Sequence, residues 1–259
     1  ERTDLIGYYN EFTKRFNETD LLKKIYEANY SEQIYITVLD EMNIARVEYY
    51  FAEFLSLLEL PKSEERYLDV VSDKWEKDPK GLKEGRIKLP DNMWFIGTAN
   101  NDDSTFAISD KVYDRAMPIE LNERADAFEC EVQPHCNVTA EHLEYLFQKA
   151  QVDYPISNEL MDKMQKLDNY LITRFKLSFG NRIMKQLRDF VPCFIACGGT
   201  EMQAVDFIVA KKVLRKFESL SLGFMKDELT KFNSYLDRLF GKDQMPICKE
   251  YVEYLKRNN

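Results

Sequence analysis

The sequence predicts an α/β region, built as a parallel sheet with helices, followed by an all-helical region. Two near-continuous apolar runs, residues 34–41 and 92–100, have the composition of strands that are covered on both faces, as parallel strands are. After about residue 122 the strand signals end, and apolar residues recur at helical spacing instead. We therefore expect two domains, residues 1–122 and residues 123–259.

The α/β region alternates between helical and strand-like segments. Residues 19–29 have apolar side chains at helical spacing and carry Thr19 as a candidate N-cap. Residues 34–41 form the first expected strand. Residues 46–60 return to helical periodicity and stop at Pro61, because proline does not continue a helix.

A charged insert and a second set of elements complete the α/β region. Residues 62–88 contain two strand-like segments, RYLDVV and GRIKL, which predict a hairpin with a polar tip. Such an insert is either solvated or faces a central pore, where it would touch a partner or DNA. Residues 92–100 form the second buried strand, residues 108–116 a short helix and residues 117–121 a third strand.

The second region reads as a set of amphipathic helices. One helix places four apolar residues on a single face: Leu160, Met164, Leu167 and Leu171. Another begins at a capping box formed by Thr200 and Gln203. Residues 224–240 and 246–257 supply two more helices.

Charge and cysteine content narrow the functional classes. The net charge of −9 argues against a chain that binds nucleic acid or anionic lipid through bulk charge. The five cysteines form no C-x-x-C pair, and their odd number fits a reducing compartment. The longest apolar runs, such as FVPCF, are too short to span a bilayer. We therefore expect a cytoplasmic protein that does not enter the membrane.

Two carboxylates stand where the first strand ends. Asp40 and Glu41 directly follow the apolar run, and the carboxyl ends of strands are where open α/β sheets bind ligands. Carboxylates are tolerated there when a metal ion or water meets them. We expect Asp40 to hold Mg²⁺ through its water shell and Glu41 to orient and deprotonate an attacking water. The alternative is a pair of solvated acids at a strand end.

Two further residues fit the same site. The second strand ends in FIGTANNDDS, where Asn100 can position water against a phosphate without adding charge. Arg115 follows in DRA, and its planar fork suits phosphoryl oxygens. The alternative for Arg115 is a structural ion pair with Asp110 or Asp114.

Two stretches, LDEMNIARVEYYFAEFLSLLE and GTANNDDSTFAISDKVYDRAMPIEL, together resemble the AAA+ ATPases of the McrB-like restriction branch. The family pattern is a Walker B motif of the form DE-x-N-x-A-x, then a sensor 1 strand ending in T-x-N-x-x-D, then an arginine. The resemblance gives catalytic roles to Glu41, to Asn100 as sensor 1 and to Arg115 as arginine finger. It gives a metal role to Asp40 and nucleotide-binding roles to Asn43 and to Asp103, the signature acid.

The resemblance covers residues 3–121, and the helical remainder is similar to an AAA+ lid. There FGNRIMKQL puts Arg182 at a nucleotide-binding sensor 2 position, with a salt-bridged lid arginine as the alternative. The opening TDLIGYYNEFTKRF resembles the loop before the second core helix of this branch. A P-loop, G-x-x-x-x-G-K-[ST], is absent: the single Gly-Lys pair, Gly241-Lys242, lacks its flanking residues. We therefore expect an incomplete AAA+ core, a downstream fragment whose P-loop lies upstream.

The resemblance implies a nucleoside-triphosphate-hydrolysing motor that uses Mg²⁺ and ATP or GTP. It implies a homo-oligomeric ring, a hexamer, that drives an McrC-like nuclease subunit in DNA restriction. Contact with DNA would come through other domains or through the nuclease. Two alternatives stay open: a MoxR-like protein-remodelling chaperone and a non-catalytic scaffold that kept the fold. Without a P-loop, the isolated fragment is expected to be inactive.

Overall fold

The chain folds into two compact units, each with its own hydrophobic core. The computed structural model describes residues 1–60, 65–71, 81–100, 102, 104–121, 124, 126–220 and 226–257. The first unit comprises Glu1–Ala116 and Glu120–Leu143, and the second comprises Met117–Ile119 and Glu144–Asn259. The predicted order, a small parallel sheet with helices and then a helical region, is confirmed in this coarse form.

The sheet that defines the first unit consists of the two predicted strands. β3 (Tyr35–Leu39) and β6 (Met93–Gly97) pair in parallel, with Tyr35 opposite Met93 and Leu39 opposite Gly97. Both strands are apolar and β-branched or aromatic over most of their length, which favours extended backbone. Because the pairing is in register, the two strands end level with one another, and the residues that follow them are neighbours.

One face of this sheet is covered by two short helices, α3 (Val47–Tyr50) and α4 (Ala52–Leu58). The ring of Phe51 stacks on that of Phe54 with centroids 4.8 Å apart, and both meet Phe95 of β6 edge-on at 5.2 and 5.4 Å. The helix predicted over residues 46–60 is interrupted at Phe51, whose backbone leaves the helical region. These aromatic contacts anchor the helices to the sheet.

The opposite face of the sheet is apolar and exposed. In the strand register Ile36 lies opposite Trp94, and Val38 lies opposite Ile96. Ile36, Val38 and Ile96 are half or more exposed, and Trp94 is 39% exposed. Parallel sheets are ordinarily covered on both faces. We call these four residues the open face.

Among the described residues, the first unit also contains two hairpins and further short helices. The predicted hairpin in residues 62–88 is present as β4 (Tyr67–Asp69) paired antiparallel with β5 (Arg86–Lys88), while its tip, residues 72–80, lies outside the described residues. The opening stretch, expected to be a loop, forms α1 (Arg2–Ile6) and a hairpin of β1 (Tyr8–Asn10) and β2 (Arg15–Asn17). The other helices are α2 (Asp20–Ala28), which Thr19 caps as predicted, and α5 (Asp110–Tyr113).

The prediction of a third strand over residues 117–121 was wrong. This segment has no strand pairing in the structure, and Ile119 and Leu121 are 75% and 90% exposed. Apolar alternation makes a strand only where a neighbouring backbone is available to pair with it. Along the chain, the two compact units meet at residues 143 and 144, apart from residues 117–119. A bridge between Gln33 and Thr139 attaches the intervening chain to the first unit.

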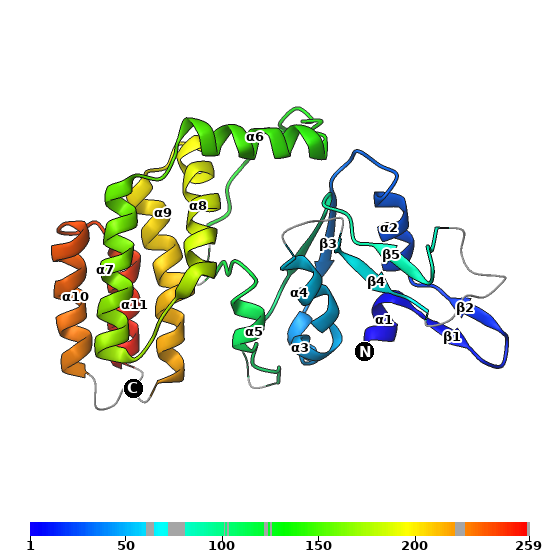
Figure 1. Ribbon diagram of the computed structural model, residues 1–259, viewed down its shortest axis with the longest axis horizontal. Coiled ribbons are helices and arrows are strands. Elements are labelled where there is room, and N and C mark those ends of the chain that lie inside the picture. Colours follow the sequence, from blue (N-terminus) through cyan, green and yellow to red (C-terminus); the bar gives the residue numbers. More distant parts are fainter. Residues whose placement is uncertain are drawn as a thin grey trace. The chain divides into compact units, whose positions relative to one another are not determined.

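The second unit is helical throughout its described elements. Figure 1 shows α7 to α11 running side by side. The bounds are α6 (Ala140–Asp153), which begins in the first unit, α7 (Asn158–Phe175), α8 (Gly180–Ala196), α9 (Glu201–Ile208), α10 (Lys226–Phe240) and α11 (Pro246–Arg257). After α9 the chain continues through a π-helical turn, Val209–Val213, and a 3₁₀ helix, Leu214–Ser219.

The core of the helical unit follows the predicted periodicity. The four apolar residues predicted to share one face of α7 are all buried, and the capping box of Thr200 and Gln203 is present at the start of α9. Asp206, which is buried, accepts hydrogen bonds from the backbone amides of Ile247 (2.8 Å) and Cys248 (2.9 Å) at the start of α11. Among the helices described, none combines the length and the apolar character needed to cross a membrane.

Candidate functional site

The two predicted acids lie in a tight turn at the end of β3. Asp40 and Glu41 are both exposed, and Glu41 has a left-handed backbone with φ 48° and ψ 45°. That conformation is uncommon for a residue with a Cβ atom and indicates a backbone held by its surroundings. A 3₁₀ turn, Met42–Ile44, follows. We call residues 40–44 the acidic turn.

Thr98, the first residue after β6, is hydrogen-bonded to four consecutive residues of the other strand end. Its amide donates to the carbonyl of Leu39 (3.0 Å), and its carbonyl accepts from the amide of Met42 (2.8 Å). Its hydroxyl donates to Oδ1 of Asp40 (2.6 Å) and accepts from the amide of Glu41 (2.8 Å). The acidic turn is therefore fixed to the end of the neighbouring strand.

Asn43 forms a second connection between the two strand ends. Its side chain is buried, and Nδ2 donates to the carbonyls of Asn100 (2.7 Å) and Phe106 (3.2 Å). The amide of Phe106 donates in return to the carbonyl of Asn43 (2.9 Å). Oδ1 of Asn43 is buried and has no hydrogen-bond partner among the described residues. The contacts give this predicted nucleotide-binding residue a role in joining the two loops.

The loop that carries Asn100 is exposed and internally hydrogen-bonded. The carbonyl of Asn100 accepts from the hydroxyl of Thr105 (2.9 Å), and its side chain lies at the surface. The hydroxyl and amide of Ser104 donate to Asp102 and hold the pKa of its carboxyl below the ordinary value. Asp102 is therefore ionised at neutral pH. Asp103, the predicted signature acid, lies outside the described residues.

Tyr50 holds the acidic turn through a hydrogen bond. Its hydroxyl donates to the carbonyl of Met42 (2.8 Å), and burial raises the pKa of the phenol. The phenol therefore stays protonated at neutral pH, and it serves as a hydrogen-bond donor to the turn.

Arg115 is bound within its own unit. It lies just after α5, and its Nη2 is 2.6 Å from Oε2 of Glu59, which follows α4. Its Nη1 donates to the carbonyl of Lys111 (2.8 Å), while Nε is buried and has no hydrogen-bond partner in the described part of the chain. Both side chains of the ion pair are largely buried. The sequence suggested Asp110 or Asp114 as the structural partner, and the partner observed is Glu59.

Arg182 belongs to the helical unit. It lies in the first turn of α8, on the exposed side of that helix, while Ile183 beside it is buried. The site described above is built from the first unit alone, and its residues come from the ends of β3 and β6 and from the loops that follow.

The donor set of the acidic turn fits a cation held through water. Asp40 is exposed, and Thr98 occupies one of its two oxygens, which leaves the other for a water ligand. Mg²⁺ keeps several of its waters and binds proteins through one or two carboxylates together with substrate phosphates. Over the described part of the chain, no group of three or more histidine, cysteine, aspartate or glutamate side chains could hold a metal directly.

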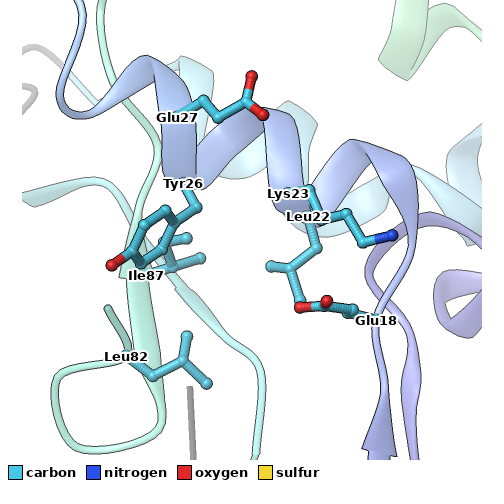
Figure 2. A pocket seen from close by; sticks show the side chains of 7 residues that line it. All are labelled: Glu18, Leu22, Lys23, Tyr26, Glu27, Leu82 and Ile87. Atoms are coloured by element: carbon cyan, nitrogen blue, oxygen red, sulfur yellow. The ribbon is translucent and has the colours of Figure 1, made fainter. Parts of the chain in front are cut away.

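A separate surface pocket of about 290 Å³ lies between α2 and the β5 hairpin. Figure 2 shows its lining: Glu18, Leu22, Lys23, Tyr26, Glu27, Leu82 and Ile87. The walls are mainly apolar, and the charged groups come from α2 and the residue two before it. None of the predicted site residues lines this pocket.

Comparisons with protein-family models, curated proteins and solved structures find no match for this chain.

Proposed function

We propose that the first unit carries the hydrolytic half of a nucleoside-triphosphate site of the AAA+ type. The observation that carries this proposal is the pairing of the two strand ends. β3 and β6 end in register, so Asp40 and Glu41 lie beside Thr98 at the carboxyl edge of a parallel sheet, and Asn43 of the same turn is bonded to the carbonyl of Asn100. Ligands of open α/β sheets bind at this edge.

Each side chain of the proposed site has a role that follows from its charge. Asp40 holds the water shell of Mg²⁺, which when bound neutralises charge on the phosphoryl oxygens. Glu41 accepts a proton from the attacking water, and Asn100 positions that water without adding charge. Glu41 is exposed and no side chain donates to its carboxylate in the described contacts, so it is available to a water molecule.

The open face supports the proposal that further chain belongs to this sheet. Four apolar side chains, paired across two parallel strands, are exposed on one side, and among the described strands β3 and β6 pair only with each other. Parallel strands are stable when both faces are covered. We propose that a phosphate-binding segment with the P-loop pattern completes this sheet and supplies the backbone amides that cradle the phosphates.

The larger assembly follows from the same resemblance. We propose a homo-oligomeric ring in which Arg115 reaches the nucleotide of the neighbouring subunit and Arg182 of the helical unit contacts the nucleotide as a sensor. The ring would drive a nuclease partner on DNA, with ATP or GTP as its fuel. In this role Arg115 has to leave Glu59, with which it pairs in the structure.

One observation favours the rival function of a non-catalytic scaffold. Arg115 has a largely buried partner in its own unit, as a purely structural arginine would. The rival gives no use, however, to two exposed acidic residues at a strand end, where one hydroxyl holds the carboxylate of Asp40 and the backbone amide of Glu41.

The test is hydrolysis by the full-length protein, meaning this chain together with the proposed phosphate-binding segment. Glu41→Gln should leave nucleotide binding intact and lower turnover by about 10²–10⁴-fold, because the amide keeps the size of the side chain but cannot accept the proton. Turnover of ATP and GTP and binding by calorimetry are measured on the same preparations.

Glu32→Gln is the matched control, because Glu32 is exposed and precedes β3 by three residues, at the opposite side of the strand from the acidic turn. It should hydrolyse nucleotide like the wild type. Equal turnover by Glu41→Gln and the wild type would exclude Glu41 as the general base.

A further inference from the structure

We propose that Thr98 is the positioning residue that sets the acidic turn for hydrolysis. The inference rests on the proposed function and extends it to a residue outside the catalytic set. Its basis is the pair of hydrogen bonds made by the Thr98 hydroxyl, one to the carboxylate of Asp40 and one from the amide of Glu41.

The hydroxyl does what the backbone of residue 98 cannot do. Any residue at this position could supply the amide that reaches Leu39 and the carbonyl that reaches Met42. Only a side chain that donates and accepts at one atom can serve Asp40 and Glu41 together. Serine and threonine have that atom, whereas valine has the shape of threonine without it.

The direction of the two hydrogen bonds divides the roles of the acids. The hydroxyl proton is directed to Oδ1 of Asp40, so this carboxylate is oriented and keeps one oxygen for a water ligand. The Glu41 amide, in turn, is anchored to the same oxygen while its backbone is left-handed. That conformation departs from the extended backbone of β3, and the described contacts include no hydrogen bond between Thr98 and the carboxylate of Glu41. One acid is thus held for the cation and the other is left for water.

Because Thr98 is exposed, its positioning role can be tested apart from any effect on the stability of the protein. The residue lies at the surface, after the end of β6, and does not belong to the core of the first unit. Loss of its hydroxyl should therefore alter the acidic turn without unfolding the protein.

The first experiment measures the hydrogen bonding of the acidic turn directly in the 259-residue chain. Amide hydrogen exchange of Glu41 is measured by NMR in the wild type, Thr98→Val and Thr98→Ser. We expect exchange of this amide to rise about tenfold in Thr98→Val, as for the loss of one hydrogen bond, and to return to the wild-type rate in Thr98→Ser. Thr105→Val is the control, since its hydroxyl bonds to the carbonyls of Asn100 and Asp102 and not to the acidic turn.

The second experiment measures the effect on hydrolysis in the full-length protein. Thr98→Val should lower kcat by at least about tenfold with little change in KM, because ground-state nucleotide contacts are retained while the acids are misplaced. Thr98→Ser should restore most of kcat, which a simple loss of stability would not predict.

Two results would overturn the proposal. One is an unchanged exchange rate at Glu41 in Thr98→Val, and the other is faster exchange with unchanged kcat. Failure of the proposed function is recognised separately, because Glu41→Gln would then hydrolyse nucleotide normally. In that case the exchange result alone decides whether Thr98 sets the turn, and its role in hydrolysis falls.

Discussion

The helical unit covers its own core, whereas the α/β unit leaves one face of its sheet exposed. In the helical unit Phe217 and Phe232 are completely buried, and the rings of Phe175, Phe217 and Phe232 contact one another at centroid distances of 4.7 to 5.9 Å. In the α/β unit aromatic rings cover one side of β6, while Trp94 and Ile96 on the other side are exposed.

The difference concerns the centre of each unit: the aromatic rings of the helical unit are enclosed, whereas the central sheet of the α/β unit exposes four apolar side chains on one face. Buried apolar surface supplies most of the stability of a folded unit, and a large exposed apolar patch is typical of a surface that takes part in an interaction. The candidate site lies in the unit with the exposed patch, at the edge of the same sheet. The candidate site and the open face therefore lie in the same unit.

The largest stability effect is expected in the helical core. Phe232→Ala should lower the free energy of unfolding of the helical unit by about 3–5 kcal/mol, because it removes a fully buried ring and leaves a cavity. Val38→Ala on the open face should change stability by about 0.5 kcal/mol or less, as surface substitutions do. Denaturant unfolding followed by circular dichroism measures both.

The comparison between the two units is contradicted if the two substitutions lower the free energy of unfolding equally. A Val38→Ala penalty similar to that of Phe232→Ala would mean that the open face is covered in solution.

A smaller effect is expected from the buried thiol of Cys248. Burial raises the pKa of this thiol well above its ordinary value, and its Sγ donates to the carbonyl of Asp206 at 3.3 Å. Above about pH 9 the unfolded thiol loses its proton while the folded one keeps it. Stability of the helical unit should thus fall with rising pH, by at most about 1.4 kcal/mol per pH unit from this group.

Cys248→Ala isolates that contribution, because every other titrating group is common to both proteins. The free energy of unfolding of Cys248→Ala should fall less steeply between about pH 9 and 11 than that of the wild type. Identical slopes would show that the thiol ionises equally in the two states and is not enclosed by the core.

Local patterns in the sequence were enough to predict the elements of both units in outline. The two parallel strands, the N-cap at Thr19 and the capping box at Thr200 all depend on near neighbours, and each is present. Helices α6 and α8 were not predicted. Only Ala150 is buried along α6, which weakens its apolar periodicity, and α8 contains Pro192, an ordinary signal for the end of a helix.

The site depends on contacts between residues that are far apart in the sequence, and local patterns do not specify such contacts. The contact of Thr98 with the acidic turn follows from the register that sets Leu39 opposite Gly97, and the sequence alone does not fix that register. The pairing of Arg115 with Glu59 joins residues that follow two different helices, α5 and α4. The strand expected at residues 117–121 shows the same limit, because strand formation requires a partner elsewhere.

Arg115 provides the most direct test of the central claim, that this chain holds one half of a hydrolytic site shared between subunits. In the full-length protein, Glu41→Gln and Arg115→Ala should each bind nucleotide and each be nearly inactive, since an arginine finger contributes roughly 10³–10⁵ in rate. Arg115→Lys should rescue little, because a point charge does not replace the planar fork.

The decisive measurement is hydrolysis by a mixture of Glu41→Gln and Arg115→Ala subunits. If Arg115 acts on the neighbouring subunit, some interfaces in a mixed ring unite an intact Glu41 with an intact Arg115, and part of the activity returns. If mixed rings form and no activity returns, Arg115 acts within its own subunit or serves only its ion pair with Glu59, and the account of a shared site is contradicted.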